Sequence, residues 1–333
     1  MPKTLVTGAA GFIGFHLCKR LLAEGHEVVG LDAVTDYYDT ALKRARLALL
    51  EGEGFSFVEG RVETGGLLLG LFENHRFDYV YHLAAQAGVR HSIEKPREYL
   101  DSNITGTFEL LEAARAYPPK HMLIASTSSA YGSNTEMPYL ETMKTDHQMS
   151  FYAATKKATE SMAHSYAHLY DLPTTMFRFF TVYGPWGRPD MALFKFTKAI
   201  LEGAPIDVYN HGRMMRDFTF VDDLVAALHR LAPVAPQRGA PAGPEDSLSP
   251  VAPWRVVNIG NGSPVKLGEF IEAIEAATGL PAKRNLLPMQ PGDVPATWAG
   301  TTLLARLAGE SQYTPVGEGV RRFVEWYREY YAV

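Results

Sequence analysis

A tyrosine and a lysine four residues apart form the strongest catalytic signal in the sequence. Tyr152 and Lys156 lie in a stretch with helical spacing, so their side chains are expected on one helix face. The neighbouring ammonium group is predicted to favour the phenolate and to lower the pKa of Tyr152 toward neutrality. Such a tyrosine can remove the proton of a substrate hydroxyl while a hydride leaves the same carbon. The preceding hydroxyl cluster, Ser126-Thr127-Ser128-Ser129, favours a catalytic pair over a solvated helix face.

Three glycines near the N-terminus indicate a site for a dinucleotide. Gly8, Gly11 and Gly14 follow a strand-like stretch and open a helix-like one. Glycine at these places lets the backbone turn sharply and approach a pyrophosphate, and the helix N-terminus offers free N–H groups. Asp32 follows Gly14 by 18 residues, at the end of the next predicted strand. Its carboxylate can accept the adenosine ribose hydroxyls and repels a 2′-phosphate, so NAD is predicted rather than NADP.

These residues require a scaffold of alternating strands and helices. Short apolar stretches at 4–7, 27–31, 77–84, 122–126 and 174–180 predict strands, and 11–24, 97–115 and 149–170 have helical spacing. The alternation is typical of an α/β protein with a Rossmann-type, doubly wound parallel sheet. We expect a cofactor-binding domain over residues 1–180, which includes the Tyr/Lys helix. Residues 181–333 are expected mainly to form a smaller C-terminal α/β substrate-binding domain, with some chain returning to the first.

The C-terminal half contains a proline-rich segment at 232–253. Six prolines in this segment make a helix or a central strand improbable. It is predicted to be an exposed loop without chemistry, between a helix at 221–231 and a strand at 255–259. Residues 320–331 predict an amphipathic surface helix.

Composition excludes several classes of protein. The 333 residues are 46% hydrophobic and 21% charged, as in ordinary globular proteins, and the net charge of -5 makes nucleic acid an unexpected partner. The sequence has one cysteine, Cys18, so it can form neither an intrachain disulfide nor a cysteine-based metal site. No metal is predicted. No apolar run reaches the length of a membrane span and no signal peptide is expected, which fits a cytoplasmic protein.

The motifs together resemble the extended short-chain dehydrogenase/reductases over residues 3–331. Within that superfamily the chain is most similar to the NAD-dependent nucleotide-sugar epimerases, above all the UDP-glucuronate 4-epimerases. Five further stretches carry this resemblance: Leu83–Arg90, Phe179–Pro185, Arg216–Asp223, the segment 290–294 and the proline-rich insertion before Arg255.

The resemblance implies a role for each matching residue. The cofactor would be NAD, held at its pyrophosphate by Gly8, Gly11, Phe12, Ile13 and Gly14, at its adenosine ribose by Asp32, and along its length by Leu83, Ala84 and Ala85. Tyr152 would be the base, Lys156 would bind the nicotinamide ribose, and Thr127 would bind the reacting hydroxyl. The UDP-sugar would be held by residues from both halves of the chain: Arg90, Ser128, Ser129, Thr181, Arg188, Arg216 and Asp293. A homodimer formed through the helices at 97–115 and 149–170 is also implied.

One position departs from the family pattern. Family members usually carry an acid after the third strand that binds adenine, whereas the matching position here is Arg61. Either Arg61 stacks on the adenine or that contact is lost.

The implied reaction is inversion at carbon 4 of UDP-glucuronate to give UDP-galacturonate, through a 4-keto sugar that rotates within the site. Three other enzymes remain alternatives: a UDP-galactose 4-epimerase, a UDP-glucuronate decarboxylase and a sugar 4,6-dehydratase. The dehydratase is disfavoured because it needs an acid beside Thr127, where this chain has Ser128. A non-catalytic NAD sensor is the non-enzyme alternative, and the intact Thr127, Tyr152 and Lys156 disfavour it.

Overall fold

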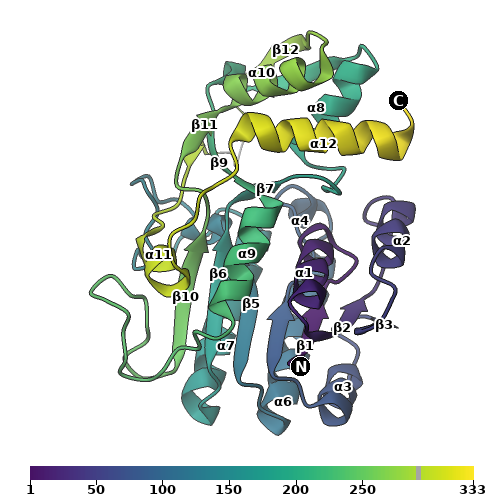
Figure 1. Ribbon diagram of the computed structural model, residues 1–333. Coiled ribbons are helices and arrows are strands. Elements are labelled where there is room, and N and C mark those ends of the chain that lie inside the picture. Colours follow the sequence, from purple (N-terminus) through teal and green to yellow (C-terminus); the bar gives the residue numbers. More distant parts are fainter. Residues whose placement is uncertain (290–293) are drawn as a thin grey trace.

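A seven-stranded parallel sheet forms the centre of the protein. The computed structural model describes residues 1–289 and 294–333. The sheet order is β10-β6-β5-β4-β1-β2-β3, and all of these pairs are parallel (Figure 1). The predicted Rossmann-type fold is therefore confirmed. The strands are β1 (Lys3–Thr7), β2 (Glu27–Asp32), β3 (Phe55–Glu59), β4 (Tyr79–His82), β5 (His121–Thr127), β6 (Thr174–Phe179) and β10 (Trp254–Ile259).

Helices cover both faces of this sheet because its strands are apolar on both sides. One face packs against α1 (Phe12–Ala23), α9 (Val221–Leu231) and α11 (Thr302–Ala308). The other face packs against α3 (Leu67–His75), α6 (Gly106–Ala116) and α7 (Phe151–Tyr170). The helix α2 (Thr40–Ala48) follows β2 and lies beside α1 at the β2–β3 edge of the sheet (Figure 1).

The predicted helix at 97–115 is not continuous. The short helices α4 (His91–Glu94) and α5 (Pro96–Tyr99) are followed by a π-helical segment, η1 (Leu100–Thr105), and then by α6. Asn103 in η1 is buried and turns inward, where its amide contacts both Gln86 and Thr155. The widened turn thus ties the loop after β4 to the helix that carries Tyr152 and Lys156.

A second, smaller layer lies beyond the carboxyl ends of the large sheet (Figure 1). Its strands form two small sheets, in which β9 pairs with β7, β11 and β13, and β8 pairs with β12. The aromatic rings of Phe218 and Phe270 stack at 3.9 Å within its core. The elements are β7 (Thr181–Tyr183), α8 (Ala192–Leu201), β8 (Pro205–Tyr209), β9 (Met215–Phe220), β11 (Pro264–Lys266), α10 (Leu267–Thr278), β12 (Lys283–Leu287), β13 (Ala296–Thr297) and α12 (Val316–Tyr331).

The proline-rich segment has no helix or strand, but part of it is anchored rather than exposed. The Asp246 carboxylate pairs at 3.1 Å with the guanidinium of Arg255 in β10, and both side chains are buried. The Ser247 hydroxyl accepts a hydrogen bond from the backbone N–H of Val256 at 3.0 Å. Since β10 is an edge strand, these contacts cover an edge that would otherwise be open to another chain.

None of the helices in the described ranges is long and apolar enough to cross a membrane.

Candidate cofactor and substrate cleft

The turn from β1 into α1 is crowded to a degree that only glycine permits. Gly8 has a φ of +76°, and a Cβ there would lie 2.8 Å from the backbone nitrogen of Ala84. A Cβ on Gly14 would lie 2.0 Å from the carbonyl oxygen of Gly8. No side chain caps the N-terminus of α1 at Gly11. Its N–H groups and positive dipole end are therefore directed at the adjoining cleft, as an anion site requires.

Asp32 holds the same turn from the neighbouring strand. Its carboxylate accepts hydrogen bonds from the backbone N–H groups of Ala10, at 3.0 Å, and Val34, at 2.8 Å. Val34 has a φ of 45°, which a β-branched residue seldom adopts. Asp32 thus fixes both its own loop and the glycine-rich turn, and it remains half-buried at the wall of the cleft.

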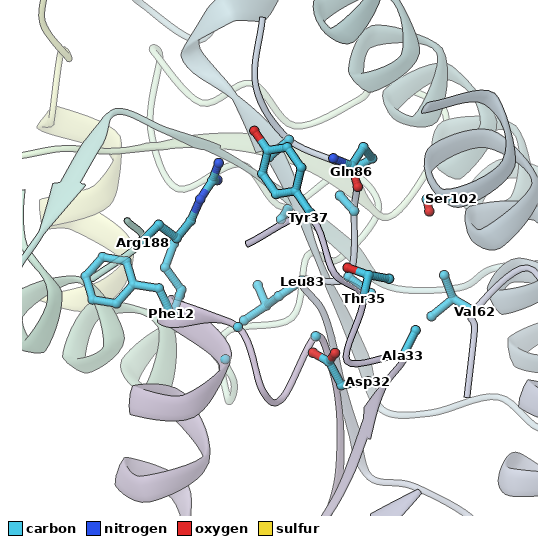
Figure 2. A pocket seen from close by; sticks show the side chains of 18 of the residues that line it. Phe12, Asp32, Ala33, Thr35, Tyr37, Val62, Leu83, Gln86, Ser102 and Arg188 are labelled. Atoms are coloured by element: carbon cyan, nitrogen blue, oxygen red, sulfur yellow. The ribbon is translucent and has the colours of Figure 1, made fainter. Parts of the chain in front are cut away.

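A long cleft runs along the carboxyl ends of the large sheet. Figure 2 shows Asp32 at one end, Phe12 and Arg188 to one side, and Tyr37 and Gln86 farther along. The residues predicted to bind NAD all line it: Gly8, Gly11, Phe12, Ile13, Gly14, Asp32, Leu83, Ala84, Ala85, Tyr152 and Lys156. Of the predicted substrate residues, Thr127 and Arg188 also line it.

The catalytic candidates meet where β5 ends and α7 begins. The Ser150 hydroxyl caps α7 by accepting from the Ala153 N–H at 3.1 Å, which starts the helix just before Tyr152. The Lys156 ammonium is buried and donates to the Ala125 carbonyl at 2.8 Å. The Thr127 hydroxyl accepts from the Ser129 N–H at 3.1 Å. Tyr152, Lys156 and Thr127 therefore line one part of the cleft, as predicted from the sequence.

The predicted activation of Tyr152 by Lys156 is wrong for the protein alone. Burial raises the pKa of the Tyr152 phenol, and the hydrogen bond with Thr127 and the positive charge of Arg188 oppose this increase without overcoming it. Burial also lowers the pKa of Lys156 to about 8, against the opposite effect of the Glu160 carboxylate. Desolvation of the Tyr152 phenol therefore outweighs the contacts that favour the phenolate.

A buried ion pair supports this catalytic corner from beneath. Glu160, one helical turn after Lys156, accepts from Arg178 at 2.9 and 2.8 Å, and both side chains are almost fully buried. Glu160 also accepts the hydroxyl of Ser126 at 2.7 Å. Arg178 holds the pKa of Glu160 below its usual value despite burial. The pair fixes α7 against β5 and β6, since breaking a buried pair is strongly destabilising.

The histidine at the end of β4 is structural. The His82 ring contacts the hydroxyls of Thr7, at 2.8 Å, and Thr107, at 3.4 Å. The Thr7 hydroxyl also accepts from the Ala84 N–H at 3.1 Å. Burial lowers the pKa of His82 to about 3, so the ring is neutral. It positions the loop after β4 that lines the cleft.

Arg188 lies at the far side of the cleft, in a loop of the second layer. Its guanidinium binds Asp190 in bidentate fashion, at 3.0 and 2.6 Å. The Tyr37 hydroxyl, from the loop after β2, donates to the same carboxylate at 3.3 Å. This contact joins the cofactor side of the cleft to the arginine predicted to bind the substrate.

Other predicted substrate residues do not line the large cleft in the described part of the chain. Thr181 lines an adjacent apolar pocket, together with Phe218 and Phe323. Arg90 is exposed and lies over the ring of Tyr209 at 5.4 Å. Arg216 donates to the Met215 carbonyl at 2.9 Å. Ser128 and Ser129 begin a short 3₁₀ turn after β5, and Asp293 lies outside the described residues.

At the adenosine end, the fold supplies an acid that the motif comparison missed. Arg61 and Glu63 both line the cleft, and the Arg61 guanidinium donates to the Glu63 carboxylate at 3.2 Å. The Glu63 carboxylate thus lies two residues after the position at which family members carry an acid. Arg61, which occupies that position, binds it.

Several cleft residues carry no motif signal. Tyr37, Lys43 and Ser102 line the cleft but belong to no motif in the sequence, and Gln86 lies inside the Leu83–Arg90 stretch without a role implied for it. The Lys43 side chain is buried, and its ammonium group donates a hydrogen bond to the Thr35 carbonyl at 2.6 Å. In the sequence, the aromatic pair Tyr37-Tyr38 in the segment after Asp32 is the feature that could have indicated this wall of the cleft.

Comparisons with known proteins agree with this geometry. A model of the NAD dependent epimerase/dehydratase family matches residues 4–240. The chain belongs to the NAD dependent epimerase/dehydratase family. It is 55% identical, over 99% of its length and 98% of the relative's, to a probable UDP-glucuronate 4-epimerase of Rhizobium meliloti. Among solved structures, it resembles the UDP-glucuronic acid 4-epimerase of Bacillus cereus in complex with UDP-glucuronic acid and NAD, and the UDP-glucose 4-epimerase of Thermotoga maritima with UDP-glucose.

The two structural matches cover nearly whole chains. For the Bacillus cereus enzyme the TM-score is 0.87 at 31% identity, over 99% of this chain and 100% of the other. For the Thermotoga maritima enzyme the TM-score is 0.83 at 29% identity, over 99% of both chains. The family membership, the fold and the dependence on NAD predicted from the sequence are confirmed.

The cleft suits NAD. The space that a Cβ would fill at Gly8 and Gly14 is taken up by close backbone packing, which leaves the open N-terminus of α1 beside the cleft. Asp32 stands at the next strand end, and Tyr152 and Lys156 line the opposite part. These are the positions that a dinucleotide in a Rossmann fold requires for diphosphate, ribose and nicotinamide.

Replacing Asp32 tests the cofactor preference. Asp32→Ala removes a carboxylate that repels a 2′-phosphate, so the ratio of NADP to NAD affinity should rise by at least roughly tenfold. Mass spectrometry of the nucleotide released on denaturation, with binding titrations of both cofactors, measures this. Asp36→Ala, which removes an exposed acid from the same loop, should leave the ratio unchanged. Release of mainly NADP from the parent protein would contradict the assignment and implicate Arg61.

Proposed function

We propose that this protein is an NAD-dependent epimerase that interconverts UDP-glucuronate and UDP-galacturonate by inversion at carbon 4. The observation that carries this proposal is a single cleft that contains a dinucleotide turn, a Tyr152/Lys156/Thr127 cluster and Arg188. The identity of 55% with a probable UDP-glucuronate 4-epimerase over nearly the whole chain selects the substrate. The sheet with its helices provides the cofactor side, and the smaller layer from residue 181 onward provides the nucleotide-sugar side.

NAD bound in the cleft would supply reversible hydride transfer at carbon 4 of the sugar. Tyr152, as the phenolate, accepts the proton of the 4-hydroxyl and returns it to the keto oxygen when hydride comes back to carbon 4. Thr127 binds the same oxygen and orients it. The pKa of Tyr152 is raised in the protein alone, so it must fall in the complex for this transfer to proceed. Lys156 and Arg188, the cations that line this part of the cleft, stabilise the phenolate.

Epimerisation requires the sugar to turn while the nucleotide stays bound. Guanidinium groups suit diphosphate oxygens, so Arg188 and Arg216 are assigned to the diphosphate, with Asp293 on the uridine ribose. The sugar is held by short hydroxyl side chains, which release it more easily than an ion pair would. The 4-keto sugar can then rotate about the bonds that join it to the diphosphate.

The carboxylate of the substrate creates a hazard. The 4-keto intermediate is a β-keto acid, which loses carbon dioxide fastest when the breaking bond stands perpendicular to the carbonyl plane. We assign Thr127, Ser128, Ser129 and Thr181 to hold the carboxylate near that plane. Thr127 lines the large cleft, and Thr181 lines the pocket that adjoins it at Arg188. Arg90 is assigned to the rim or the diphosphate, in keeping with its exposed place over Tyr209.

We further infer a two-fold symmetric homodimer through the helix pair α6 and α7. Leu100, Phe108 and Leu169 are large apolar side chains of this region that are exposed. A second copy of the chain would cover them. A monomer mass in light scattering at micromolar concentration would exclude this dimer.

The buried Cys18 thiol is compatible with the cytoplasmic location predicted from the sequence.

The assignment of the base is tested by Tyr152→Phe. This variant should fold and retain NAD but lose at least roughly a hundredfold in epimerisation rate, the usual scale for a positioned acid–base group. Tyr170→Phe, at the other end of α7, is the matched control and should keep the parent rate. A Tyr152→Phe protein with near-parent activity would show that another group removes the proton.

Two variants test which residues hold the carboxylate of the substrate sugar. Thr181→Ala should weaken use of UDP-glucuronate and raise the share of decarboxylated product, because the carboxylate is less firmly held. Arg90→Met should weaken binding of free UDP about as much as binding of UDP-glucuronate, measured by calorimetry. If Arg90→Met abolishes only binding of the uronate and leaves UDP affinity at the parent value, an ion pair holds the carboxylate.

A further inference from the structure

A buried arginine joins three segments around the cleft. Arg46 in α2 is fully buried. One of its terminal nitrogens donates to the Ala10 carbonyl at 2.8 Å and to the Tyr38 hydroxyl at 2.7 Å. The other donates to the carbonyls of Trp186, at 2.7 Å, and Gly187, at 3.3 Å.

All four acceptors are uncharged. Among residues 1–289 and 294–333, the ion pairs of the structure do not include Arg46. Burying a cation without a carboxylate is costly, and a buried helix position of this kind would ordinarily hold an apolar residue. What a guanidinium provides, and an apolar side chain does not, is a rigid fork of N–H groups that holds several carbonyls in one fixed arrangement.

The three segments are the ones that build the two halves of the cleft. Ala10 belongs to the glycine-rich turn, and Tyr38 to the wall after β2. Trp186 and Gly187 immediately precede Arg188. Trp186 has a φ of 60°, a conformation that bulky residues rarely adopt, so the turn depends on contacts such as the one to its carbonyl.

A second contact links the same two sides. Tyr37, beside Tyr38, donates to the Asp190 carboxylate, which in turn binds Arg188. The Arg188 guanidinium lies over the Tyr37 ring at 5.8 Å, and Figure 2 shows the two side chains next to one another at the cleft. The Arg188 loop is therefore held through its backbone by Arg46 and through its side chains by Tyr37.

We propose that Arg46 is a positioning residue that couples the cofactor turn to Arg188, so that binding of NAD and binding of the nucleotide sugar strengthen each other. Order imposed on the Ala10 turn by one ligand is transmitted through the guanidinium to the turn at 184–188, and the coupling is reciprocal. The proposal rests on the proposed function for the identity of the two ligands.

A folded protein that lacks the Arg46 guanidinium should bind both NAD and the nucleotide less tightly. Arg46→Met and Arg46→Lys are expected to weaken UDP binding, measured by calorimetry, by roughly tenfold and to release NAD during purification. Arg46→Lys keeps the positive charge, but an ammonium group lacks the planar array of N–H groups that bonds all three segments. If Arg46→Met fails to fold, the test is made with Arg46→Lys alone. Arg20→Met, which removes an exposed arginine from α1, is the control and should match the parent. A folded Arg46→Lys protein with parental UDP affinity and NAD content overturns the proposal.

A double-mutant cycle separates positioning from general stabilisation. If Arg46 acts through Arg188, replacing Arg46 in an Arg188→Met background should change UDP affinity by less than roughly twofold. Additive losses, or an Arg188→Met variant that binds UDP like the parent, contradict the proposal. Because UDP binding needs no turnover, these results are independent of whether the parent epimerises UDP-glucuronate, and failure of that activity alone would count against the proposed function only.

Discussion

The backbone of the turn after β1 lies so close to its neighbours that side chains at Gly8 and Gly14 cannot be accommodated. The nitrogen of Ala84 and the carbonyl of Gly8 occupy the space that each Cβ would need. This close approach brings together the ends of β1 and β4 and the start of α1. The dinucleotide turn, the Asp32 contact to Ala10 and the Arg46 contact to the same residue all depend on it.

Polar groups buried behind the cleft determine where the reactive groups can lie. Glu160 and Arg178 fix α7 on the sheet, Asn103 fixes it to the loop after β4, and His82 with Thr7 holds that loop at Ala84. The Glu160 carboxylate, the Asn103 amide and the His82 ring each have hydrogen-bonding partners within the fold, so their burial costs little relative to that of an unpaired group. Tyr152 and Lys156 are therefore held by a rigid frame. The loop with Arg188 is held by Tyr37 and Arg46 and by packing of Trp186 against aromatic rings of α1 and α12.

The features predicted from the sequence are those fixed by local spacing. The glycine turn, the alternation of strands and helices, and the Tyr152/Lys156 pair require only neighbouring residues to be interpreted. Arg46 could not be distinguished from an ordinary surface arginine, because its acceptors lie 36 and 140 residues away along the chain. The pKa of Tyr152 was predicted in the wrong direction since spacing shows the ammonium group but not the burial. Likewise, composition predicted an exposed insertion at 232–253 but could not show that Asp246 pairs with Arg255.

The central claim is that the protein inverts carbon 4 of a uronate with a cofactor that it keeps. Chromatography of the products formed when the purified protein is incubated with UDP-glucuronate, without added NAD, tests this claim most directly. The account predicts a mixture of UDP-glucuronate and UDP-galacturonate, with little decarboxylated product. Formation of a UDP-pentose as the main product, or no conversion by protein that retains NAD, would contradict it.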